Sequence, residues 1–176
     1  MKKLEKVIKF TVPLLIFAII SAFFINIKLV IISFFSLLLL IGYIIYKEKI
    51  GQELIVAFLI SIAWCSYYFY EYTTFNLFMG KINLFPLIAF TFGLVFLREI
   101  YEKIKGKYKF IKISLFYVIC LFIVEYIGYY LLNIKLISSF PSLLNLGIIH
   151  APLIMKIFYV FIGPVYILIT DYLKVK

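Results

Sequence analysis

Long apolar runs, separated by short charged or polar breaks, dominate this sequence. A bilayer core is about 30 Å thick, so a helix needs about 20 mainly apolar residues to cross it. Several runs approach that length. The composition agrees, because 66% of the residues are hydrophobic and only 15% are charged, which leaves too little polar surface to cover a soluble domain. The sequence therefore predicts an all-α integral membrane protein.

The apolar runs predict a six-transmembrane-helix bundle in which residues 1–176 form a single membrane domain. The expected spans are 10–26, 29–46, 54–72, 82–97, 113–132 and 150–170. The first two are separated because one straight helix over 10–46 would be roughly 55 Å long, against a core of about 30 Å. The first run is longer than the apolar part of a signal peptide, so we expect an uncleaved anchor.

The basic residues predict the orientation. If all six spans cross and the N-terminus is cytoplasmic, 14 of the 18 basic residues fall on the inner side, three on the outer side and Lys156 within a span. Cytoplasmic loops carry such an excess of lysine and arginine. Without the short span 82–97, the basic segment 98–112 would lie outside, so the same rule supports that span. We expect a multi-pass protein of the cell membrane with both termini cytoplasmic.

The net charge of +10 follows from this distribution. The expected partners are the lipid bilayer and the anionic headgroups of its inner leaflet, each basic side chain adding about 1 kcal/mol of attraction. Nucleic acid is not an expected partner. Because the loops are so unequal in charge, the chain should insert one way only. Any homo-oligomer is therefore expected to be parallel, and a larger membrane complex is equally compatible.

Few residues of the sequence are suited to cofactor or metal chemistry. Cys65 and Cys120 both lie within predicted spans, no C-x-x-C motif occurs, and the chain has a single histidine. Phosphate-binding loops, nucleophile elbows and H-E-x-x-H motifs are also missing from the sequence. We therefore expect no metal and no cofactor.

Two ionisable side chains lie deep within predicted spans. Glu125 is roughly 12 Å from the outer end of its helix at 1.5 Å per residue, too deep for its short side chain to reach water. Lys156 is about 9 Å deep on the same scale, and its longer side chain has the alternative of extending to the interface. We expect the two to pair toward the bundle interior, with Gly128 allowing close helix approach. Such a pair serves either helix registry alone or a substrate or proton site. The alternative to pairing is a protonated Glu125 beside a Lys156 that extends to the interface.

Further polar side chains accompany this pair. Tyr129 is one turn from Glu125, Tyr159 is one turn from Lys156, and His150 lies at the outer mouth of the last helix. A polar, aromatic-lined pocket open to the outer side is expected. With Glu71 of the third span added, the predicted intramembrane polar cluster is Glu125, Lys156, His150, Glu71, Tyr129 and Tyr159.

The outer segments are also unusual. Glu71 and the neighbouring tyrosines are assigned to an interfacial belt. Segments 73–83 and 133–146 are too apolar for solvated loops and too short to span, so they are expected to form interfacial or re-entrant lids. In the last span, Gly163 and Pro164 are expected to form a hinge, with Pro152 starting the helix.

Three functional hypotheses remain. An accessory or structural component requires no site and is ranked first, so the sequence favours a protein that is not an enzyme. The second is a small carrier or binding protein, a transporter that admits a charged or zwitterionic solute at a site formed by Glu125 and Lys156. The third is a membrane enzyme acting on lipid or isoprenoid substrates, with Glu125 or His150 as general acid or base.

Overall fold

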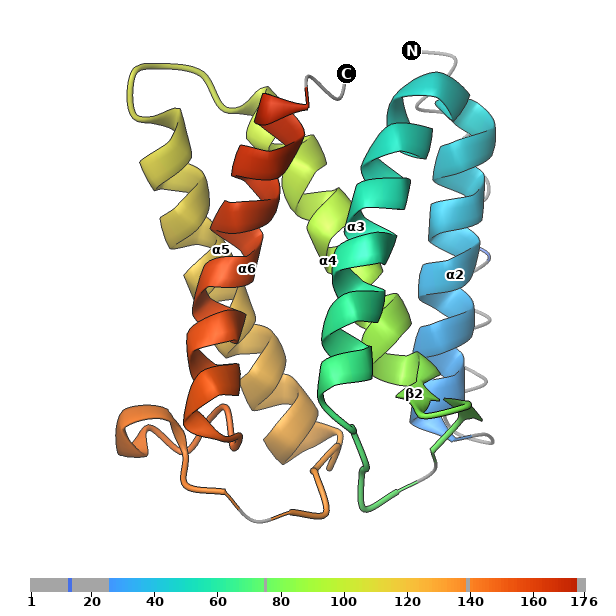
Figure 1. Ribbon diagram of the computed structural model, residues 1–176, viewed down its shortest axis with the longest axis vertical. Coiled ribbons are helices and arrows are strands. Elements are labelled where there is room, and N and C mark those ends of the chain that lie inside the picture. The colour runs from blue at the N-terminus through green and yellow to red at the C-terminus, as the bar shows by residue number, and fades with distance from the viewer. Residues whose placement is uncertain (1–12, 14–25, 75, 139, 174–176) are drawn as a thin grey trace.

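The computed structural model describes residues 13, 26–74, 76–138 and 140–173, and it is mostly helical. Its elements are α2 (Ile27–Ile45), α3 (Lys47–Tyr67), β1 (Phe78–Met79), β2 (Ile82–Asn83), α4 (Leu84–Lys103), α5 (Lys109–Tyr126), the π-helix η1 (Ile127–Leu131), the 3-10 helix η2 (Leu143–Asn145) and α6 (Leu153–Tyr172). The helices run alternately up and down (Figure 1).

Five helices in the described ranges are long and apolar enough to cross a membrane. The outward face of α5 shows why lipid suits them. Ile111, Leu115, Ile119 and Ile123 are all more than half exposed, and Ile113 is the one buried residue of the helix. Such a surface would be costly in water but is well solvated by acyl chains. The chain is therefore inserted in a membrane.

Two ends of the bundle can be distinguished (Figure 1). The basic end contains the α2–α3 turn, the α4–α5 connection and the C-terminal end of α6. The loop end contains residues 68–83 and 132–152. Helix α4 contacts each of the other four long helices and is the centre of the arrangement.

Five of the six expected spans correspond to these helices, whereas span 10–26 lies outside the described residues except for positions 13 and 26. For two of these spans, the helix bounds in the structure differ from the expected ones. Helix α3 ends at Tyr67 rather than at residue 72, because the chain then becomes extended and pairs with the other outer segment. Helix α4 begins at Leu84 and extends past the end of the expected span 82–97. The helix continues to Lys103, and Arg98 is buried inside the bundle.

The loop end is built from backbone pairing. Strands β1 and β2 form a hairpin that turns at Gly80, whose φ of +61° favours glycine. Thr73 N donates to Lys135 O at 2.8 Å and Ile137 N donates to Glu71 O at 2.9 Å. The two outer segments therefore hold each other by backbone hydrogen bonds.

Asn83 connects this end to α4. Its side chain is 1% exposed and accepts from Phe85 N at 3.1 Å, which caps the helix. It also donates to Tyr70 O at 3.0 Å and to Asn76 Oδ1 at 2.9 Å. One amide thus fixes the start of α4 against both neighbouring loop segments.

A charged cluster joins three helices at the basic end. Arg98 of α4 donates to Asp171 of α6 at 2.5 Å, and its Nε lies 3.8 Å from the Glu53 carboxylate of α3. Tyr101 donates to the other Asp171 oxygen at 2.7 Å. Glu53 is fully buried. From the sequence, Arg98 was counted only among the basic residues that predict the orientation, and this cluster was not predicted.

Candidate functional site

A cavity of about 440 Å³ lies between α3, α4, α5 and α6 and reaches the loop end. This volume is within the range of about 300–1,000 Å³ that is usual for small-molecule sites. Most of its wall is aliphatic or aromatic. The lining side chains that carry polar atoms are Ser61, Trp64, Tyr70, Tyr72, Tyr117, Cys120, Glu125, Tyr129, His150 and Tyr159.

The cavity has an open flank along α4 and α5. Gly93 and Phe96 of α4 and Phe116 and Val124 of α5 line it and are also exposed on the outside of the protein. A Cβ added at Gly93 would meet nothing within 4 Å, so this part of the wall is not filled by side chains. In a membrane, this flank faces acyl chains. The cavity is therefore open between α4 and α5 within the described ranges.

Glu125 is the one formally charged side chain among the lining residues. It is half-buried, and within the described ranges it forms no hydrogen bond or ion pair. Burial raises the pKa of Tyr70 and of Tyr72 well above the usual range, and the Glu125 carboxylate adds to both increases. The carboxylate therefore acts electrostatically on the aromatic wall of the loop end.

Tyr70 and Tyr159 form a pair of buried hydroxyls. Trp64 Nε1 donates to Tyr70 OH at 2.5 Å, and the Tyr159 hydroxyl lies 3.2 Å from the same oxygen. The indole only donates. The two hydroxyls thus have two hydrogens but share one hydrogen bond. In the described part of the chain, one O–H is left to donate into the cavity.

Two further lining atoms are buried without a hydrogen-bond partner in the described structure, Ser61 Oγ and His150 Nδ1. His150 lies before the start of α6, whose N-cap is Pro152, and its ring stacks on Tyr129 at 4.2 Å. Burial, together with Lys156 and Lys135, lowers the pKa of His150 below its usual value. The imidazole is therefore kept neutral near pH 7.

The expected ion pair between Glu125 and Lys156 is not formed. Lys156 Nζ donates to the backbone oxygen of Ser142 at 3.1 Å, is 8% exposed and does not line the cavity. The two residues have similar depths, but depth does not determine the direction in which a side chain leaves its helix. The lysine therefore holds the outer segment against α6.

Of the other residues in the predicted polar cluster, three line the cavity and one lies outside it. Tyr129, His150 and Tyr159 line the cavity with Glu125, whereas Glu71 is exposed outside it. The assignment of all the tyrosines near Glu71 to an interfacial belt was wrong for Tyr70 and Tyr72, which are buried lining residues. The alternation of aromatic and polar residues over 70–73 was the indication available in the sequence, because a period of two is typical of a strand rather than a helix.

Gly128 and Gly163 do not have the roles that were expected from the sequence. Gly128 was expected to admit a close partner, but a Cβ there would meet nothing within 4 Å. Close approach occurs at Gly163 instead, where an added Cβ would lie 2.6 Å from the Tyr117 ring. Helix α6 continues through Pro164. The proposed hinge at 163–164 thus coincides with a tight helix contact.

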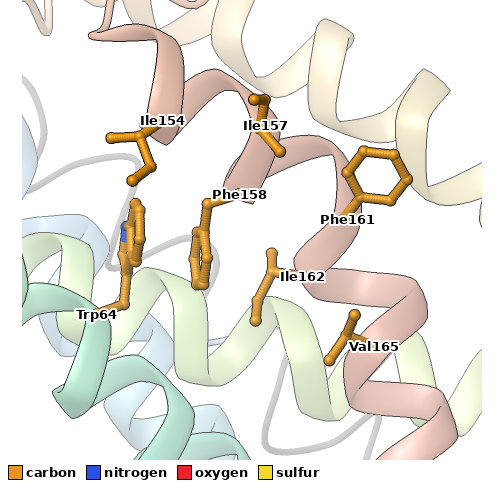
Figure 2. A pocket seen from close by; sticks show the side chains of 7 residues that line it. All are labelled: Trp64, Ile154, Ile157, Phe158, Phe161, Ile162 and Val165. Carbon is orange, nitrogen blue, oxygen red and sulfur yellow. The ribbon is translucent and has the colours of Figure 1, made fainter.

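A second, apolar groove of about 320 Å³ runs beside α6 (Figure 2). Trp64 and Phe158 stack on each other in its wall, with ring centroids 3.3 Å apart and planes at 4°. Trp64, Phe158 and Ile162 line both the groove and the cavity. This wall therefore separates a purely apolar hollow from the one that contains Glu125.

Comparisons with protein-family models, with curated proteins and with solved structures find no match. Within the described residues, no group of three or more histidine, cysteine, aspartate or glutamate side chains could hold a metal ion. The function is therefore argued from the cavity.

Proposed function

We propose that this is a multi-pass cell-membrane protein that binds an amphipathic molecule taken up laterally from the bilayer. The apolar body of the ligand occupies the aromatic part of the cavity. Its polar end lies near Glu125, Ser61, His150 and the pair of tyrosine hydroxyls. The observation that carries the proposal is a ligand-sized cavity that combines an open flank with buried polar atoms lacking protein partners.

This cavity bears on the three hypotheses. An accessory or structural role requires no cavity, so it does not account for polar atoms that line one. A carrier adds transport to binding and shares the same first step. An enzyme would need its acid and base to act together, but His150 stacks on Tyr129 and no hydrogen bond joins it to Glu125 within the described chain. Binding is therefore the function favoured by the geometry.

We further propose that the basic end faces the cytoplasm. The α4–α5 connection and its flanks carry Lys103, Lys105, Lys107, Lys109 and Lys112, whereas the opposite end of the bundle carries Lys28, Lys81 and Lys135. Lysine-rich connections remain cytoplasmic, where anionic headgroups attract them. In this orientation Glu125 lies in the outer half of the membrane. The ligand therefore enters from the outer leaflet.

Occlusion of the open flank tests the proposal. In Gly93→Leu, the new side chain extends into the space beside α4, whereas the matched control Gly93→Ala adds a single methyl group where nothing lies within 4 Å. Native mass spectrometry of the purified protein should detect a co-purifying amphiphile with wild type and with Gly93→Ala. Gly93→Leu should lose it.

A second readout uses Trp64, the only tryptophan in the chain and a lining residue. A bromine-labelled fatty alcohol should quench its fluorescence. Trp64 also borders the apolar groove beside α6, so a labelled alcohol bound there contributes to the quenching. Only the part of the quenching that Gly93→Leu removes reports on the cavity. If Gly93→Leu retains the co-purifying amphiphile and the full quenching, the proposal is wrong.

A further inference from the structure

The charges around the cavity discriminate between classes of ligand head group. Glu125 provides a carboxylate, and no lysine or arginine of the described residues lines the cavity. An anionic head group would therefore lie beside a carboxylate without a compensating cation. A neutral head group would leave Glu125 without an opposite charge in mainly apolar surroundings, so the carboxyl would have to take up a proton or stay charged at a cost. A cationic head group avoids both penalties.

Three lysines near the loop end do not line the cavity, and two of them lie over rings that do. Lys156 Nζ is bound to Ser142 O, Lys28 Nζ lies 4.0 Å from the centroid of the Tyr72 ring, and Lys135 Nζ lies 4.8 Å from that of Tyr129. The protein thus does not provide its own counter-ion to Glu125 in the described ranges.

The aromatic wall is also suited to a cation. Phe90 lies 6.1 Å from Tyr70 and 5.5 Å from Tyr159, measured between ring centroids, and the two tyrosine hydroxyls are 3.2 Å apart. All three rings line the cavity. Aromatic faces attract an ammonium group, most strongly when it is desolvated. Ser61 Oγ and His150 Nδ1 supply acceptors for ammonium N–H groups.

We infer that the cavity recognises an alkylammonium amphiphile, in which a cationic nitrogen lies against Glu125 and an apolar chain extends toward the open flank. This inference rests on the proposed binding function and specifies its ligand. A phospholipid head group is the less suitable source of the ammonium, because the cavity wall offers no lysine or arginine for its phosphate. The ligand class is therefore a phosphate-free amine with an aliphatic chain.

A head-group series tests the inference with one common chain length. In dodecyl maltoside micelles, dodecylammonium, dodecyltrimethylammonium, dodecanol, dodecyl sulfate and dodecylphosphocholine are compared for displacement of the bromine-labelled alcohol from Trp64. Each is added at low mole fraction, and the component sensitive to Gly93→Leu is measured. At least one of the two phosphate-free ammonium probes should displace the label at about tenfold lower mole fraction than dodecanol.

Variants of Glu125 provide the second arm. Glu125→Gln keeps the size of the side chain and should remove the preference for ammonium over dodecanol. The matched control is Glu71→Gln, which changes an exposed carboxylate outside the cavity and should retain it. If Glu125→Gln fails to fold, the head-group series with the wild-type protein still tests the inference.

The outcomes separate the two proposals. If all probes displace the label equally, or if dodecyl sulfate or dodecylphosphocholine is strongest, the ammonium inference is overturned while lateral binding of amphiphiles stands. A preference for ammonium that persists in a folded Glu125→Gln protein also overturns it. If no probe competes for quenching that is sensitive to Gly93→Leu, the binding function itself fails.

Discussion

The contact between α5 and α6 at Gly163 allows a quantitative prediction. A Cβ at this position would lie 2.6 Å from Tyr117 Cδ2 and 2.7 Å from both Cε2 and Cγ. Ordinary contacts between carbon atoms are about 3.5–4.0 Å, so either the ring or the helix must move by about 1 Å. The ring cannot swing away without breaking a hydrogen bond, because Tyr117 OH donates to Tyr159 O at 2.6 Å.

Gly163→Ala should therefore destabilise the protein. Overpacking costs about 1–3 kcal/mol, and the Tyr117 hydrogen bond contributes about 1 kcal/mol net if the ring has to swing away. Together they predict a loss of about 2–4 kcal/mol in the free energy of unfolding. The measurement is unfolding in mixed micelles of dodecyl maltoside and dodecyl sulfate, followed by circular dichroism.

Two controls accompany this experiment. Gly93→Ala makes the same substitution in another helix but in open space, and it should leave stability unchanged or raise it by up to about 1 kcal/mol. Tyr117→Ala removes the ring, so Gly163→Ala should cost much less in that background, giving a coupling energy in a double-mutant cycle. Wild-type stability of Gly163→Ala, or strict additivity of the two substitutions, would refute the packing argument.

Three further predictions concern buried polar groups. Arg98→Ala should lower stability by about 3–5 kcal/mol in the same assay, because it leaves the fully buried Glu53 without its arginine; the exposed control Lys105→Ala should be neutral. Asn83→Ala should cost about 2–3 kcal/mol, because it removes a helix cap and two further hydrogen bonds; an undiminished melting temperature would contradict this. The lowered pKa of His150 means that the unfolded chain binds the proton more readily, so stability should fall as the pH drops below about 6.5, and His150→Gln should abolish that slope.

The membrane environment and five of the helices could be predicted because they depend on local properties. The length of an apolar run determines whether a segment can span, and backbone hydrogen bonding in lipid requires that the span be helical. Asn83 illustrates the limit of this approach. Position 83 was included in a predicted span, but its side chain caps the helix and defines a start at Leu84. Helix ends thus depend on individual hydrogen bonds that hydropathy does not detect.

The candidate site could be predicted in part. Glu125, Tyr129, His150 and Tyr159 were expected to line one pocket, and all four line the cavity. The positions of Lys156 and of the Tyr70 segment were not foreseen. Tyr70 reaches the cavity only because its segment leaves the helix after Tyr67 and pairs with residues 135–137. This pairing joins positions that are far apart in the sequence.

The sequence by itself determined that the chain lies in a membrane, where most helices run and which side chains are too polar for their depth. Only the tertiary structure decided that Lys156 binds Ser142 O, that Arg98 meets Asp171 across 73 positions, and that Glu125 borders a cavity. The physical reason is that hydropathy constrains depth but not rotation about the helix axis. Because lipid is as apolar as the side chains, helix faces in a bilayer are selected by close packing and hydrogen bonds between distant residues.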